Sequence, residues 1–144
     1  MTRKLPLEGG KVVEGYILEL GQTADEVRRS NRPDFGRMGE RLAEAVAALA
    51  EATRWMGGAL GQSPDAALAG AAPYLRLFGL AAGGIYLAKG ALAAARDGAA
   101  NGQAQPILLA RFFAENLATA APGLKEAIIA GADSALAPAE ALAG

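Results

Sequence analysis

The 144-residue chain contains no cysteine and no histidine, and only 6% of its residues are aromatic. It therefore lacks the thiol and imidazole ligands of zinc and haem sites, and it has neither a thiol nucleophile nor a Ser-His-Asp triad. Neither sign of charge predominates, since 14 basic and 15 acidic residues leave a formal net charge of −1. That balance disfavours nucleic-acid binding. Without cysteine nothing marks an oxidising compartment, so we expect a cytoplasmic protein.

Apolar runs long enough to cross a membrane are missing as well. The longest uncharged apolar stretch in the middle of the chain runs from Leu77 to Ala88, whereas a span needs about 20 such residues. Arg3 and Lys4 have no apolar segment behind them, so the start of the chain does not resemble a signal peptide. We expect a soluble protein with no membrane partner and, at this length, one domain.

Alanine is abundant, and apolar residues recur at the three- and four-residue steps of a helix. Residues 8–30 form the first block, and residues from about 35 to 60 form the second. The predicted inner stripe of the first block is Val13, Ile17, Leu20, Ala24 and Val27. The predicted stripe of the second is Met38, Leu42, Val46, Leu49, Thr53, Met56 and Leu60. We expect the second helix to fray at Gly57-Gly58, with Gly61 in a left-handed conformation after its end.

The third block begins at Ser63-Pro64-Asp65, which suits an N-cap, a first helical proline and an acid at the positive helix end. It continues to about Arg96 and is apolar around most of its circumference, which predicts a helix covered on several sides. Pro73 predicts a kink within it. The spacing of Gly79 and Gly83, with Gly84 beside them, predicts that a neighbouring backbone approaches closely at this point.

The fourth block starts near Gln105-Pro106 and is interrupted at Pro122-Gly123 before helical spacing resumes. Its predicted inner stripe is Leu109, Phe112 or Phe113, Asn116, Leu117 and Ala120. Because no segment alternates as a strand would, the sequence predicts an all-α fold. We expect an antiparallel four-helix bundle with kinked third and fourth helices. The bundle covers residues 11–137 of a single domain, 1–144, and residues 138–144 form a frayed tail.

Acidic residues are the first candidates for chemistry. Glu115 stands among apolar neighbours that would raise its pKa towards a catalytic value, but an outward-facing carboxylate one step off the stripe fits better. The spacing is that of an ordinary solvent-exposed helix face at Glu8, Glu14 and Glu19. No pair of acids has the Glu-x-x-His spacing of di-iron bundles.

The evidence for a ligand site is equally weak at the glycines, at Arg76 and at the aromatic residues. The run from Gly57 to Gly61 lacks the Lys-Ser/Thr ending of a phosphate-binding loop, so helix termination explains it better. Arg76 in the apolar third helix is a possible phosphate ligand, although an ion pair or a snorkelling side chain is the preferred interpretation. Trp55 and Tyr74 suit the core and its rim better than a ligand cage.

Three segments together resemble one family. Residues 68–79, LAGAAPYLRLFG, are similar to the middle of the C-terminal helical domain of bacterial acyl-CoA dehydrogenases. The similarity is greatest to the long forms that include methylmercaptopropionyl-CoA dehydrogenase. Residues 111–117, RFFAENL, followed by AIIAGA at 127–132, resemble the last helix of that domain. Arg3-Lys4-Leu5-Pro6 with Gly9-Gly10 resembles the junction that leaves the catalytic portion, so residues 1–10 are assigned to it.

The resemblance implies an FAD enzyme in which a glutamate removes the α-proton of an acyl-CoA while hydride passes to the flavin. In the long forms this glutamate lies in a Tyr-Glu-Gly-Thr type stretch ahead of the Arg-Lys-Leu-Pro junction, which would place it before residue 1. We therefore assign no catalytic, cofactor-binding or metal residue to this chain, and FAD is implied for the parent enzyme alone. The chain is expected to be an accessory domain whose partners are a dehydrogenase core, itself, or both.

Two other functions stay open from the sequence. An alanine-rich helical protein of the phasin type would act alone by self-association. A small acyl-binding carrier would need an apolar cavity within the bundle.

Overall fold

A computed structural model describes residues 8–98 and 105–131, and every regular element within these ranges is helical. The four α-helices are α1 (Glu8–Ser30), α2 (Met38–Gln62), α3 (Pro64–Arg96) and α4 (Gln105–Asn116). Two short 3-10 helices, η1 (Pro33–Phe35) and η3 (Ala118–Ala120), follow α1 and α4, and residues 121–131 are again α-helical. The predicted all-α chain of four helices is confirmed. The predicted tail, and residues 1–7 of the predicted junction, lie outside the described residues.

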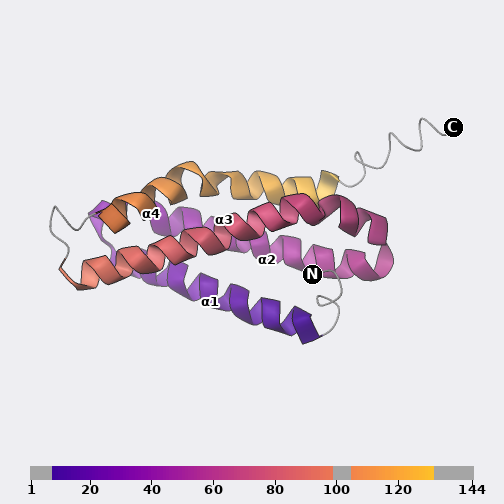
Figure 1. The fold of residues 1–144 in the computed structure, drawn as a ribbon, viewed down its shortest axis with the longest axis horizontal. Helices are drawn as coiled ribbons and strands as arrows, with labels where there is room; N and C mark the ends of the chain where they lie inside the picture. The colour runs from indigo at the N-terminus through magenta and orange to yellow at the C-terminus, as the bar shows by residue number, and fades with distance from the viewer. Residues whose placement is uncertain (1–7, 99–104, 132–144) are drawn as a thin grey trace.

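The helices lie along one long axis, and each runs opposite to the one before it (Figure 1). Helices α2 and α3 pack against each other in the centre, and each also contacts α1 and α4. Helix α1 covers one side of this central pair and α4 the other side (Figure 1). The surface therefore carries two seams between outer and inner helices, one between α1 and α2 and one between α3 and α4.

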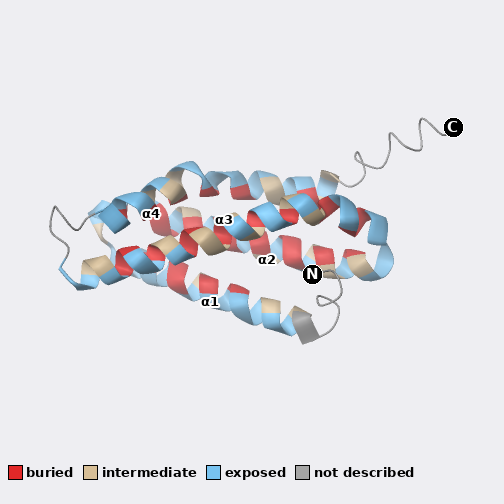
Figure 2. Cartoon of the chain, in the orientation of Figure 1, coloured by how far each residue is buried: buried red, intermediate tan, exposed pale blue. Residues whose placement is uncertain are grey.

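The core forms where the apolar stripes of the first two helices meet α3. Figure 2 shows buried residues along each helix, mostly on the sides that face the other helices. In α1 the predicted stripe is buried from Ile17 to Val27, and Val13 packs against it. In α2 the predicted stripe is buried from Met38 to Met56, and Leu60 packs against the same core. Hydrophobic periodicity identified both faces because polar residues occupy the opposite sides.

The end of α2 differs from the prediction. The helix continues through Gly57, Gly58 and Gly61 to Gln62, and Ser63 ends it with an extended φ of −147°. The Ser63 N–H donates to the Ala59 carbonyl, and the Ser63 carbonyl accepts from the Ala67 N–H. Ser63 thus joins two helices with a single residue. Ser63 is the predicted N-cap residue of α3, but its side chain makes no cap hydrogen bond.

Helix α3 is continuous through Pro73 and contacts the other three helices. It is the one described helix that is long and apolar enough to cross a membrane, with a mean hydropathy of 1.5 over 18 residues. Only two charged residues, Arg76 and Lys89, interrupt its middle. The apolar character of α3 therefore extends beyond the uncharged stretch from Leu77 to Ala88. Of that 18-residue window, 39% is buried inside the structure. The buried apolar residues of α3 fill the core of the bundle, and the others lie at its surface.

Close approach to α3 occurs at Gly84, one of the three glycines for which it was predicted. A Cβ on Gly79 would meet nothing within 4 Å, and one on Gly83 would meet only the Phe113 ring, at 3.8 Å. A Cβ on Gly84, in contrast, would lie 2.6 Å from Leu42 Cδ2 and 3.2 Å from Phe113 Cε1. Gly84 therefore lets α2 and α4 pack closely on α3, and the prediction for Gly79 is wrong.

The fourth helix buries a different face from the one predicted. Its inward residues are Ile107, Ala110 and Ala114, followed by Ala118 of η3. The predicted inner positions that are exposed instead are Leu109, Phe112, Asn116, Leu117 and Ala120, while Phe113 is half-buried. Alanines face inward because their small side chains allow α4 to lie close to α2 and α3. The helical path changes at η3, before Pro122, which sits within the first turn of the next helical segment, where its missing N–H is tolerated.

Candidate functional site

A polar cluster joins the start of α2 to the end of α4. Glu115 Oε2 accepts the backbone N–H of Arg37 at 2.7 Å, and Glu115 Oε1 accepts from Arg111 Nε at 3.1 Å. Gly36 lies directly against this pair, with φ at +54° and no room for a Cβ beside Arg111 Nε. The position needs glycine both for its left-handed backbone and for the close approach. Glu115 thus ties two segments that are far apart in the sequence.

The cluster stabilises the charged form of Glu115. The hydrogen bond from the Arg37 backbone, followed by that from the Arg111 side chain, lowers the pKa of Glu115 despite partial burial. The less favoured alternative, in which apolar neighbours raise this pKa, is wrong, because Phe112 points to solvent and Arg111 supplies a cation. A carboxylate held ionised by two donors is a poor proton acceptor near neutral pH. Glu115 is therefore a structural anchor.

Replacing Glu115 with glutamine will lower the free energy of unfolding by about 1 kcal/mol at pH 7, since charge-assisted hydrogen bonds are lost at a partly exposed site. A carboxylate whose pKa falls on folding stabilises the fold above its unfolded pKa, about 4.3, and this stability is lost as pH falls through the folded value. The gap between wild type and variant will therefore close below about pH 4. Urea titrations from pH 3 to pH 8 measure it, with Glu19→Gln as the exposed control. A gap that persists unchanged at pH 3 contradicts the assignment.

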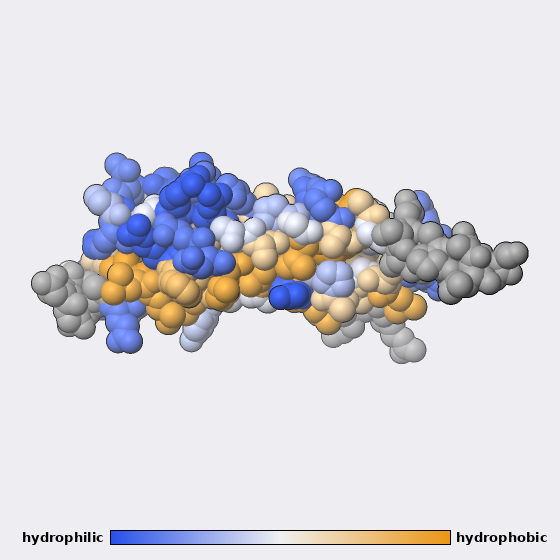
Figure 3. All heavy atoms as spheres, turned by 90° about the horizontal axis from the view of Figure 1, so that it is seen from above, coloured by the Kyte–Doolittle hydropathy of each residue, from blue (hydrophilic) through white to orange (hydrophobic). Residues whose placement is uncertain are grey.

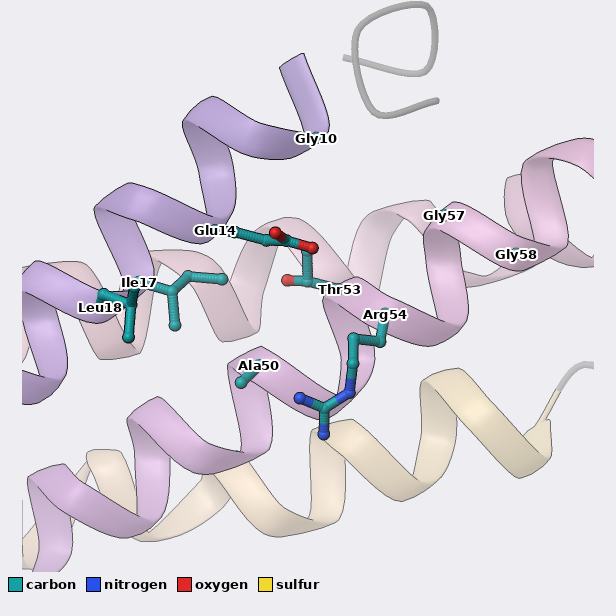
Figure 4. Close-up of a pocket in the computed structure, with 9 residues that line it drawn as sticks. All are labelled: Gly10, Glu14, Ile17, Leu18, Ala50, Thr53, Arg54, Gly57 and Gly58. Atoms are coloured by element: carbon teal, nitrogen blue, oxygen red, sulfur yellow. The ribbon is translucent and has the colours of Figure 1, made fainter. Parts of the chain in front are cut away.

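A shallow groove follows the α1–α2 seam. Its volume is about 440 Å³, and it lies where α1 diverges from α2 towards Gly10, with Glu14 and Arg54 on opposite walls (Figure 4). Its nine lining residues are Gly10, Glu14, Ile17, Leu18, Ala50, Thr53, Arg54, Gly57 and Gly58. A second hollow of about 360 Å³ extends it along the same seam. The two glycines of α2 are helix interior here, so they form no phosphate-binding loop.

The second groove lies on the α3–α4 seam and has a volume of about 550 Å³. It is lined by Tyr86, Leu87, Lys89, Gly90, Gln105, Pro106 and Leu109. Tyr86 is 76% exposed and Leu109 is 52% exposed, so this groove opens along its length to solvent. Sequence reasoning missed it because it placed Leu109 inside the bundle. The signal that could have found it is the second apolar stripe of α4, beside the stripe of alanines.

The other candidate residues have ordinary structural surroundings. Arg76 is exposed and takes part in none of the ion pairs among the described residues, so of the two preferred alternatives the ion pair is not seen there and the snorkelling side chain stays a prediction. Tyr74 is buried, and its hydroxyl lies 2.8 Å from Thr53 Oγ1. Trp55 is half-buried against the core, and Glu14 and Glu19 are exposed. The side chain of Glu8 lies outside the described residues.

The buried polar side chains of the described residues offer a flavin no free partner. The buried polar side chains are Thr23 and Thr53, and each already donates to a backbone carbonyl of its own helix. Within residues 8–98 and 105–131, no buried side-chain nitrogen or oxygen lacks a partner, and no three acidic side chains gather in a metal-binding group.

The family described as Acetyl-CoA dehydrogenase C-terminal like matches residues 16–138. The chain belongs to this family. It is also 33% identical over 105 residues to 3-methylmercaptopropionyl-CoA dehydrogenase of Ruegeria pomeroyi. That match covers 73% of this chain but only 18% of the longer protein. No solved structure matches the chain.

The resemblance read from the sequence is thereby confirmed, and the four helices form an acyl-CoA dehydrogenase C-terminal-like domain. The match begins at Tyr16, within the first half of α1, and extends beyond the last described residue. Both grooves and the Glu115 cluster therefore lie largely within the matched region.

Proposed function

We propose that this domain is an accessory part of an FAD-dependent acyl-CoA dehydrogenase and that it packs on the catalytic core without taking part in the chemistry. The observation that carries this proposal is the match of one family over residues 16–138, together with a relative in which the matched segment is 18% of the length. The α,β-dehydrogenation of an acyl-CoA, the FAD and the proton-accepting glutamate would then belong to the core. We place the assembly in the cytoplasm.

The polar groups favour an accessory role without chemistry, because they hold the bundle together. Charges along α2 neutralise one another in the pairs Arg37–Glu40 and Arg41–Glu44, and Glu115 fastens the end of α4 to the start of α2. We infer a single domain over residues 1–144, with an antiparallel bundle at 11–137. Pro73 and the turn before Pro122 account for the proposed kinks in its third and fourth helices.

Mixing the full chain with the catalytic part of the Ruegeria pomeroyi relative, prepared without its own matched segment, tests this function. We expect binding at micromolar concentrations, measured by isothermal titration calorimetry. The flavin absorbance and cooperative melting of the catalytic part show that it is folded, and bovine serum albumin is the control for non-specific adsorption. No association at micromolar concentrations would remove the proposed function.

A stand-alone helical protein that self-associates is the second candidate, and the exposed apolar residues of α3 and α4 favour it. Light scattering of the chain on its own distinguishes the two. A stable dimer that does not bind the catalytic part would support self-association.

A further inference from the structure

Helices α3 and α4 expose a continuous band of large apolar side chains. We call this band the α3–α4 stripe, and its large members are Leu68, Leu75 and Tyr86 on α3 and Leu108, Leu109 and Phe112 on α4. Each of the six is between 52% and 76% exposed. In Figure 3, which looks onto the α4 side, hydrophobic residues form a band beside a hydrophilic patch.

The α3 part of the stripe is one face of the helix, since its members are seven and eleven residues apart. Small or apolar residues, such as Ala72, Gly79 and Ala93, continue the exposed face between and beyond them. The opposite face of α3 already fills the core with Leu77, Ala81 and Ile85. The α3–α4 stripe is therefore additional to what the bundle itself needs. Single exposed apolar residues are common on soluble proteins, whereas a contiguous band across two helices marks an interaction surface.

The charges beside the middle of the α3 part of the stripe are basic, whereas Asp65 and Asp97 lie at its two ends. Arg76 and Lys89 flank its α3 part, both are exposed, and neither is in an ion pair among the described residues. The arginines of α2, by contrast, pair with glutamates of the same helix. A partner that covers the stripe is thus complementary if it is apolar in the centre and carries carboxylates opposite Arg76 and Lys89. A second copy would bring two more cations to the same surface.

The area of the stripe helps to decide between a second copy of the chain and another domain as its partner. Its α3 part, from Leu68 to Ala93, is about 37 Å long, and α4 adds about 18 Å. At about 10 Å per helix, the stripe covers roughly 550 Å². Two free chains in a stable dimer bury about 800 Å² each, whereas interfaces between domains of one chain begin near 600 Å² in total. The stripe therefore suits a domain interface better than a free dimer.

We propose that the α3–α4 stripe is the surface that packs on the dehydrogenase catalytic part, with Arg76 and Lys89 facing carboxylates of that part. This inference rests on the proposed function. In this arrangement the α1–α2 groove and the ion-paired face of α2 stay exposed to solvent.

The test compares two double variants of the full chain in binding to the catalytic part of the Ruegeria pomeroyi relative. Tyr86→Asp with Leu109→Asp places two charges on the stripe. Val12→Asp with Leu18→Asp makes the same change on α1, where both residues are about 70% exposed. We expect the stripe variant to bind at least tenfold more weakly and the α1 variant to bind like wild type. Arg76→Gln with Lys89→Gln should also weaken binding and make it less sensitive to salt.

Circular dichroism melting identifies a variant that fails to fold. In that case hydrogen exchange of the unchanged chain decides, because adding the catalytic part should protect the amides of α3 and α4 and leave those of α1 unchanged. If wild type binds and the stripe variant binds equally well, or if protection falls on α1, the stripe is the wrong surface although the proposed function stands. A free chain that dimerises through the stripe and ignores the catalytic part would overturn both.

Discussion

Replacing Leu77 with alanine will lower the free energy of unfolding by about 3 kcal/mol, whereas Leu75→Ala will lower it by less than about 1 kcal/mol. The two leucines lie two residues apart in α3, and the same atoms are removed from each. Leu77 is fully buried at the centre of the bundle, while Leu75 is 57% exposed on the α3–α4 stripe. Removing the buried side chain loses its transfer free energy and leaves a cavity among rigid neighbours, which together amount to about 2–5 kcal/mol.

Urea denaturation of the two variants and of wild type, followed by circular dichroism at 222 nm, measures the difference. Alanine raises helix propensity slightly at both positions, so that contribution cancels between them. Equal losses at the two positions would mean that Leu75 is covered in the free chain. That result would remove both the exposed face of α3 and the surface proposed for the catalytic part.

The two helices that the sequence predicted best are those with one apolar face. In α1 and α2, polar residues alternate with the stripe at helical spacing, so periodicity alone identified the buried side from Ile17 to Met56. Helix α3 has apolar residues on two faces, and periodicity cannot say which of them a neighbour covers. The same ambiguity reversed the prediction for α4, where Ala110 and Ala114 face inward and Leu109 and Phe112 face outward. Residue size misled the prediction because close packing favours the smaller side chains.

The candidate site shows a second limit of sequence reasoning. Glu115 was singled out for its apolar neighbours in the chain, yet its environment is set by Arg37, which lies 78 positions away, and by Gly36 beside it. No local pattern reports a backbone N–H that approaches from another helix. The family resemblance, by contrast, could be read from short segments, and two of the three lie within residues 16–138, which the family matches. Family membership was therefore predictable where individual contacts were not.

Replacing Gly84 with leucine will destabilise the bundle by about 3 kcal/mol, whereas Gly79→Leu will leave its stability unchanged or raise it by up to about 1 kcal/mol. Both positions are helix interior in α3, and leucine gains about 1 kcal/mol over glycine in helix propensity at each. At Gly79 nothing lies within 4 Å of a new Cβ. At Gly84 the first added carbon already lies 2.6 Å from Leu42 Cδ2, and Leu42 is itself fully buried.

A leucine at position 84 should displace one neighbouring helix more than the other, and hydrogen exchange can show which one moves. The remaining leucine atoms must displace Leu42 of α2 or the Phe113 ring of α4, and such strain costs about 1–3 kcal/mol or more beyond the propensity gain. Because α4 is the shorter and outer helix, we expect it to move, which would speed hydrogen exchange across Gln105–Asn116 more than across α2. Thermal melts of the two variants give the stability difference. If Gly84→Leu is as stable as Gly79→Leu, α2 and α4 do not pack closely at this point, and the glycine has no structural role there.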